Sequence, residues 1–225
     1  MQSNEREIGG LRGPFRGPLQ STTTGHPEQI VILLHGWGAD GSDLIDLAEP
    51  LSQFLPHAAF FSPHAPHPCS ASAFGREWFD LTDRSQMHRH AIAAMTQLHT
   101  ALDGVRTTFE LPAHKMILSG FSQGGMMSLL AGLCYASPLA GIVSIAGALL
   151  ADDEIPEAHS QAAPVMMIHG DADPVVPFQA LDLGLTQLKS KGYQTSRLAC
   201  AGVAHGISPE AVTEMGKFAQ AALED

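Results

Sequence analysis

Long hydrophobic runs are scarce in this chain, and their scarcity argues against several classes of protein. The longest nearly apolar stretch, residues 140–151, is too short to cross a bilayer. Residues 1–7 are polar and carry no apolar segment of the kind found in a secretory signal. We therefore expect a cytoplasmic protein without stable membrane insertion.

Cysteine and basic residues are also few. Cys69, Cys134 and Cys200 are odd in number and widely separated, which is typical of free thiols in a reducing compartment. They lack the spacing of metal ligands. Only 12 Lys and Arg stand against 23 Asp and Glu, and a net charge of −11 disfavours nucleic acid and anionic membranes as partners. We expect no metal, no cofactor and no nucleic-acid partner, and a homodimer is left open.

What the chain does have is a regular alternation of strand-like and helix-like patterns, without an internal repeat or an interdomain linker. This alternation predicts one α/β domain over residues 1–225, with a mainly parallel sheet, helices on both faces and no large cap domain. Residues 1–10 are expected to be mobile, and 11–19 to hold a short antiparallel edge strand. The expected strands are 30–34, 58–62, 115–119, 141–146, 164–168 and 195–200, and the expected helices are 42–54, 85–109, 123–135, 178–191 and 209–222.

The pentapeptide Gly120-Phe121-Ser122-Gln123-Gly124 is the most informative feature of the sequence. It joins an apolar strand pattern to a helical pattern, which is the context of a G-x-S-x-G nucleophile elbow. In such a turn the glycines let chain segments pass closely, and the helix directs its N-terminal amides at the reaction site. Ser122 is therefore the candidate nucleophile.

A serine elbow needs a base and a carboxylate, which follow it in the chain in that fold. His205 is the only histidine after Asp173, so chain order selects it as the base. The carboxylate is a choice between Asp171 and Asp173. Asp171 comes directly after a strand and would suit a turn, whereas Asp173 lies further out, toward the expected position of the imidazole. We favour Asp173, which would fix the tautomer of His205.

The sequence also contains the parts of an oxyanion hole, which requires two preorganised donors. One is the backbone N–H of the residue after the nucleophile, Gln123. The other should come from the loop that follows an early strand, here the glycine-rich residues 35–41.

Taken together, these motifs resemble the phospholipase/carboxylesterase family of α/β-hydrolases, which includes acyl-protein thioesterases. The resemblance covers roughly residues 29–222 and implies the set Ser122, Asp173 and His205. It also implies that the second oxyanion donor is the backbone of Trp37, where the family usually has Leu or Tyr. The motifs occur in this order: 34–41 (LHGWGADG), 78–80 (WFD), 120–125 (GFSQGG), 169–177 (HGDADPVVP) and 202–205 (GVAH).

The substrate is less well defined by the sequence. The long irregular segment 62–84 is read as one wall of an acyl groove, with Trp78 either lining the groove or anchoring the loop in the core, and with Val176 on the opposite wall. We expect a serine carboxylesterase that acts on short to medium acyl esters through an acyl-enzyme. The alternatives are an acyl-protein thioesterase or lysophospholipase and, more remotely, a non-catalytic binding protein with the same fold.

Overall fold

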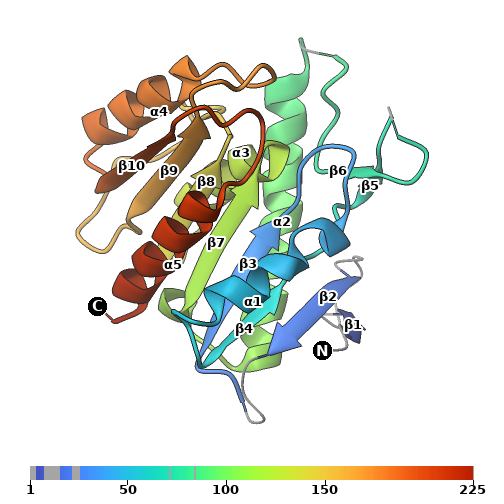
Figure 1. Ribbon diagram of the computed structural model, residues 1–225, viewed down its shortest axis with the longest axis vertical. Coiled ribbons are helices and arrows are strands. Elements are labelled where there is room, and N and C mark those ends of the chain that lie inside the picture. Colours follow the sequence, from blue (N-terminus) through green and yellow to red (C-terminus); the bar gives the residue numbers. More distant parts are fainter. Residues whose placement is uncertain (1–3, 8–15, 22–25, 71, 84, 225) are drawn as a thin grey trace.

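The computed structural model describes residues 4–7, 16–21, 26–70, 72–83 and 85–224. Their centre is an eight-stranded sheet with the order β1-β2-β4-β3-β7-β8-β9-β10 (Figure 1). From β4 to β10 neighbouring strands are parallel, whereas β2 pairs antiparallel with β4 and β1 antiparallel with β2. The sheet is thus mainly parallel, as the alternating patterns predict. Its strands are β1 (Asn4–Glu7), β2 (Arg16–Ser21), β3 (Gln29–Leu34), β4 (Ala58–Phe61), β7 (Met116–Phe121), β8 (Gly141–Ile145), β9 (Val165–Gly170) and β10 (Thr195–Cys200).

Helices cover both faces of this sheet, and the alternation of side chains along each strand explains why. On β3, Ile30, Ile32 and Leu34 enter the core that the sheet shares with α2, α3 and α4. Val31 and Leu33 point the other way, toward α1 and α5, which lie in front of the sheet in Figure 1. A strand buried on both faces must be apolar at every buried position, and residues 30–34 of β3 are. The helices are α1 (Ala48–Leu51), α2 (Met87–Phe109), α3 (Gln123–Leu133), α4 (Gln179–Ser190) and α5 (Pro209–Glu224).

The helix predicted over 42–54 is wrong as a continuous element. Two 3-10 turns, Gly41–Asp43 and Ile45–Leu47, precede the four-residue α1. Pro50 gives the physical reason, because it has no N–H to bond to the carbonyl four residues earlier and its ring crowds that carbonyl. A third 3-10 turn, Ala113–Lys115, leads into β7.

The N-terminal predictions are met only in part. The antiparallel strand expected within 11–19 is present as β2, while residues 11–15 lie outside the described part of the chain. The expectation that it forms the edge of the sheet is wrong, because β1 pairs with it on its other side. Within the first ten residues, expected to be mobile, Asn4–Glu7 form β1, and the others lie outside the described residues.

A small hairpin interrupts the segment that was read as irregular. Strands β5 (His67–Pro68) and β6 (Arg76–Glu77) pair antiparallel apart from the main sheet. No insertion of the size of a cap domain occurs among the described elements. In the same residues, no helix is both long and apolar enough to cross a membrane. The hairpin lies beside the carboxyl ends of the parallel strands, where ligands bind in open α/β sheets.

Candidate active site

Ser122 lies between the end of β7 and the start of α3, in the sharp turn that the pentapeptide predicts. Its backbone has φ 54° and ψ −118°, a conformation that residues other than glycine rarely adopt. The turn is held by hydrogen bonds from Ser122 N to Ile145 O (2.8 Å) and from Met126 N to Ser122 O (3.0 Å). A Cβ at Gly124 would collide with the carbonyl oxygen of Leu34, so only glycine fits there. The fold therefore stores strain at this serine, as active sites often do.

A histidine and a carboxylate complete a hydrogen-bonded chain from Ser122. The Nε2 atom of His205 lies 2.9 Å from Ser122 Oγ, and its Nδ1 lies 2.7 Å from Asp173 Oδ2. Since a carboxylate accepts, Nδ1 carries the proton and the bare Nε2 can accept from the serine hydroxyl. This is the arrangement in which a serine can be deprotonated as it attacks.

The structure separates the two aspartates that the sequence left open. The Asp173 side chain is fully buried, and its second oxygen accepts hydrogen bonds from the amides of Val175 (2.8 Å) and Val176 (3.0 Å). Burial acts to raise the pKa of Asp173, but the hydrogen bonds from His205 and these amides outweigh it and hold the pKa below its ordinary value. Asp173 is therefore ionised next to the imidazole. Asp171 is exposed and accepts instead from Gly202 N (2.6 Å), bracing the loop that leads to His205.

A second histidine, His169, lies behind Asp173 and was not singled out from the sequence. It is 1% exposed, and its Nε2 lies 3.0 Å from Val176 O and 3.2 Å from Asp173 Oδ2. It thus braces the loop that carries the acid. The sequence signal that could have indicated its role is its position near the end of the buried strand β9, just before the loop that carries Asp173.

One predicted oxyanion donor lies at the start of α3 and the other on the loop after β3. Gln123 is the first residue of α3, and the first amides of a helix have no partner within it. The amide of Trp37 has no hydrogen-bond partner among the described residues, while the backbone of the two residues after it is held in place. Gly38 N donates to Arg76 O (3.0 Å), and Arg76 N donates to Ala39 O (2.8 Å). A Cβ at Gly36 would lie 3.4 Å from Ser122 Cβ, so this loop borders the serine.

The sequence left two interpretations of Trp78, a residue that lines the groove or one that anchors the loop in the core. Its surroundings are those of a core anchor. It is 1% exposed; its indole donates to His35 O (2.8 Å) and its amide to Gln123 Oε1 (2.9 Å). The side-chain amide of Gln123 also donates, through Nε2, to Phe79 O (2.7 Å). Through its indole and its backbone amide, Trp78 therefore ties the loop of Trp37 to the first residue of α3. Val176, the other predicted groove residue, is 6% exposed, and its backbone binds Asp173 and His169.

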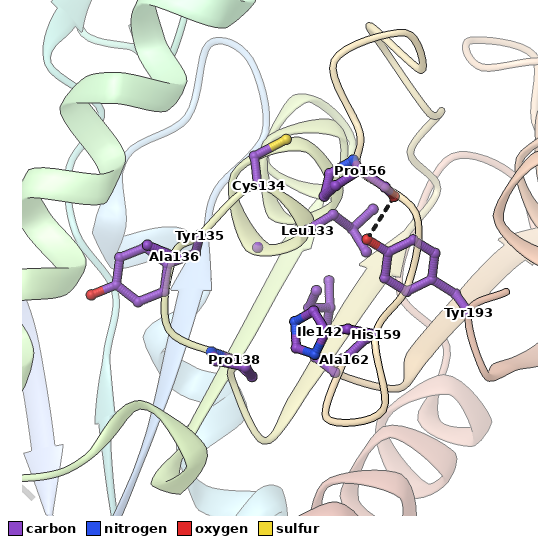
Figure 2. Close-up of a pocket in the computed structure, with 12 residues that line it drawn as sticks. Leu133, Cys134, Tyr135, Ala136, Pro138, Ile142, Pro156, His159, Ala162 and Tyr193 are labelled. Carbon is purple, nitrogen blue, oxygen red and sulfur yellow. Dashed lines mark hydrogen bonds between the residues drawn. The ribbon is translucent and has the colours of Figure 1, made fainter. Parts of the chain in front are cut away.

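A cavity and a cluster of potential metal ligands lie elsewhere on the protein. A cavity of about 240 Å³ is lined by residues that include Cys134, Pro156 and Tyr193, whose hydroxyl donates to Pro156 O at 3.1 Å (Figure 2). It lies at the C-terminal end of α3, about 16 Å along that helix from Ser122. Burial raises the pKa of the Cys134 thiol, which makes it a poor nucleophile.

Among the described residues, one group of three potential metal ligands comes together. It consists of His88, Asp153 and Glu154, all exposed, and includes none of the residues around Ser122. Exposed acidic groups are common without an ion, so the hydrogen-bonded chain at Ser122 remains the feature that defines the site.

His35 makes the loop of Trp37 sensitive to acid. It is fully buried; its Nδ1 donates to Gly36 O (2.8 Å), and its Nε2 accepts from Ala65 N (2.9 Å), which only a neutral ring can do. Burial lowers its pKa from 6.5 to about 4. As the pH falls below 6.5 the unfolded chain takes up the proton first, so the free energy of unfolding should drop between pH 6.5 and 4, by roughly 3 kcal/mol in all.

Urea unfolding at pH 8, 6 and 4.5 measures this effect. His35→Asn should lower stability at pH 8 and flatten the decline toward acid. His57→Asn, at an exposed histidine, should keep the parent's decline. If His35→Asn declines as steeply as the parent, His35 is not the group responsible.

The order of the site along the chain defines the class of protein. Serine, then carboxylate, then histidine, on a mainly parallel sheet with a strand–serine–helix turn, is the arrangement of the α/β-hydrolases. The sequence profile of the phospholipase/carboxylesterase family matches residues 21–223, so the chain belongs to that family. It is an enzyme that hydrolyses carboxylic ester or thioester bonds.

Individual relatives agree with this membership. The chain is 31% identical over 220 residues to acyl-protein thioesterase 1 of Gibberella zeae, an alignment that covers 89% of this chain and 93% of the relative. The crystal structure of esterase PE8 is 34% identical, with a TM-score of 0.85, and the match covers 92% of this chain and 98% of that one. A carboxylesterase from Mesorhizobium loti, 18% identical with a TM-score of 0.79 over 96% of this chain and 98% of its own, shares the fold.

Proposed function

We propose that the protein is a serine carboxylesterase that hydrolyses short to medium acyl esters through an acyl-enzyme. One observation carries the proposal: Ser122 Oγ, the His205 ring and the Asp173 carboxylate form a continuous chain with separations of 2.9 and 2.7 Å. That spacing supports proton transfer from the serine as it attacks a carbonyl carbon.

The proposed reaction follows from this geometry. Ser122 attacks the ester carbonyl while His205 Nε2 takes its proton, and Asp173 stabilises the resulting imidazolium. The amides of Trp37 and Gln123 donate to the oxyanion, a contribution worth a few kcal/mol. His205 then returns the proton to the departing alcohol or thiol. Water, deprotonated by the same imidazole, attacks the acyl-enzyme; the bond between the acyl carbon and Ser122 Oγ breaks, His205 returns the proton to Oγ, and the carboxylic acid is released.

An acyl-protein thioesterase is the second candidate, and the names of the curated relatives favour it. Proteins from Gibberella zeae, Dictyostelium discoideum and Schizosaccharomyces pombe that are 30–31% identical to this chain carry that name or are called its homologue. The chemistry would be the same, because a thioester is attacked by the same nucleophile. The two candidates differ in the acyl length that the site accepts.

We expect the rate to rise with acyl length and then to fall, with a maximum at or below about eight carbons. Each methylene that fits an apolar groove adds up to ~0.8 kcal/mol, and this gain ends where the chain protrudes into water. The partly exposed Trp37, on the loop whose Gly36 borders Ser122, and the absence of a cap domain among the described residues support a short, open groove. The measurement is kcat/KM for p-nitrophenyl esters from acetate to palmitate, with the matching acyl thioesters alongside.

Background hydrolysis is subtracted with the Ser122→Ala variant. Peak activity on palmitoyl substrates would overturn the short groove and favour the thioesterase or lysophospholipase. A folded protein inactive toward the whole panel would favour the non-catalytic alternative. The cytoplasmic location and the homodimer stay predictions from the sequence.

A further inference from the structure

The indole of Trp37 is held by a buried carboxylate from the β5–β6 hairpin. Its Nε1 donates to Glu77 Oε2 at 2.7 Å, across 40 positions of sequence. Glu77 is only 6% exposed, whereas Trp37 is 37% exposed and follows Gly36, whose position borders Ser122. A carboxylate inside the protein thus fixes a large aromatic side chain at the edge of the site.

This contact is more than an ordinary surface hydrogen bond, because a buried carboxylate is costly without donors. The other donors to Glu77 Oε2 are more distant: Ser70 N at 3.4 Å and Ser70 Oγ at 3.5 Å. The indole N–H is therefore its principal partner. A charge-assisted hydrogen bond of this length is stronger than a neutral one and directional, so it restricts the rotamer of Trp37.

The backbone around Trp37 is fixed by the same hairpin. Arg76, next to Glu77, bonds through its backbone to Gly38 and Ala39. Its guanidinium in turn donates to the carbonyls of Ala65 and Pro66. Residues 76 and 77 thus hold the indole of Trp37 and the backbone of the two residues that follow it, while the Trp37 amide keeps its proton unbonded among the described residues.

We propose that Glu77 is a positioning residue that locks the Trp37 indole as a fixed wall of the acyl site, and that this wall selects acyl groups unbranched next to the carbonyl. This rests on the proposed function. If the Trp37 amide binds the oxyanion at about 3 Å, its Cβ lies within a few ångströms of the carbonyl carbon. Substituents on the first acyl carbon would then meet the indole, while a linear chain could pass it.

The test compares kcat/KM for p-nitrophenyl butyrate with that for the 2,2-dimethylpropanoate ester. The parent should strongly prefer butyrate. Glu77→Leu removes the acceptor at similar volume and should reduce this preference roughly tenfold, the lower end of the roughly 10- to 200-fold discrimination that one methylene in a hydrophobic pocket produces. Glu77→Gln keeps an acceptor oxygen and should stay close to the parent.

Trp37→Phe removes the indole N–H that donates to Glu77. The role of this hydrogen bond can therefore be tested even if Glu77→Leu does not fold. In the Glu77→Leu background Trp37→Phe should reduce the preference little further, because the lock is already gone. A readout independent of activity is the indole N–H signal of Trp37 in ¹⁵N-resolved NMR, assigned with Trp37→Phe. It should be protected from solvent exchange in the parent and in Glu77→Gln, and exchange faster in Glu77→Leu.

The outcomes are distinguishable. A wild-type preference in Glu77→Leu together with a released indole would overturn the selectivity role. An indole signal that is unchanged in Glu77→Leu would overturn the lock itself. Failure of the parent to hydrolyse either ester would instead count against the proposed function, and the NMR result would still report on the lock.

Discussion

The Ser122→Ala variant is expected to fold like the parent and to lose on the order of 10³-fold or more in kcat, because members of such a triad act as a unit. The hydroxyl contributes one contact to the fold, to His205 Nε2, so its removal leaves the core intact. Circular dichroism and urea unfolding check the fold, and hydrolysis of p-nitrophenyl butyrate gives the rate.

Ser190→Ala is the matched control, since Ser190 is exposed at the end of α4 and should keep the parent's activity. A Ser122→Ala protein that retains activity within tenfold of the parent would show that another residue is the nucleophile.

The second large effect is expected at the acid. Asp173→Asn should lower kcat about 10⁴-fold, since an amide can donate to His205 and so favour the wrong tautomer. Asp171→Asn should stay within about tenfold of the parent, because an asparagine oxygen can still accept from Gly202 N, and a hydrogen bond is worth about 1 kcal/mol net. Steady-state kinetics of the two variants on one ester measure the contrast.

These two substitutions are matched in chemistry and lie two positions apart, so their ranking is informative. The reverse order would mean that Asp171 is the acid and that the observed contact between Asp173 and His205 is not the functional one.

Much of this site could be anticipated because its signals are local or follow chain order. A strand buried on both faces, such as β3, must be apolar at every buried position, so it is visible in the sequence. The turn around Ser122 requires glycines, which are visible too. His205 follows from being the only histidine after the acid.

Other features depend on contacts between distant segments and leave no local pattern. The bond between Glu77 and Trp37 exists only because the β5–β6 hairpin folds against the loop after β3. The sequence alone does not show that His169 contacts Asp173, and this contact is visible only in the structure. Trp78 could have lined a groove or anchored the core, and its bonds to His35 and Gln123 decide its environment. In each case the partner was set by tertiary packing.

The most direct test of the central claim is the site of covalent labelling by a fluorophosphonate. The reagent reacts with a serine activated by an adjacent base, so it reports the nucleophile without any assumption about the substrate. Intact-protein and peptide mass spectrometry should find one adduct, on Ser122, that is absent from Ser122→Ala and slowed in Asp173→Asn. A folded protein that takes up no label, or an adduct on a different serine, would contradict the account.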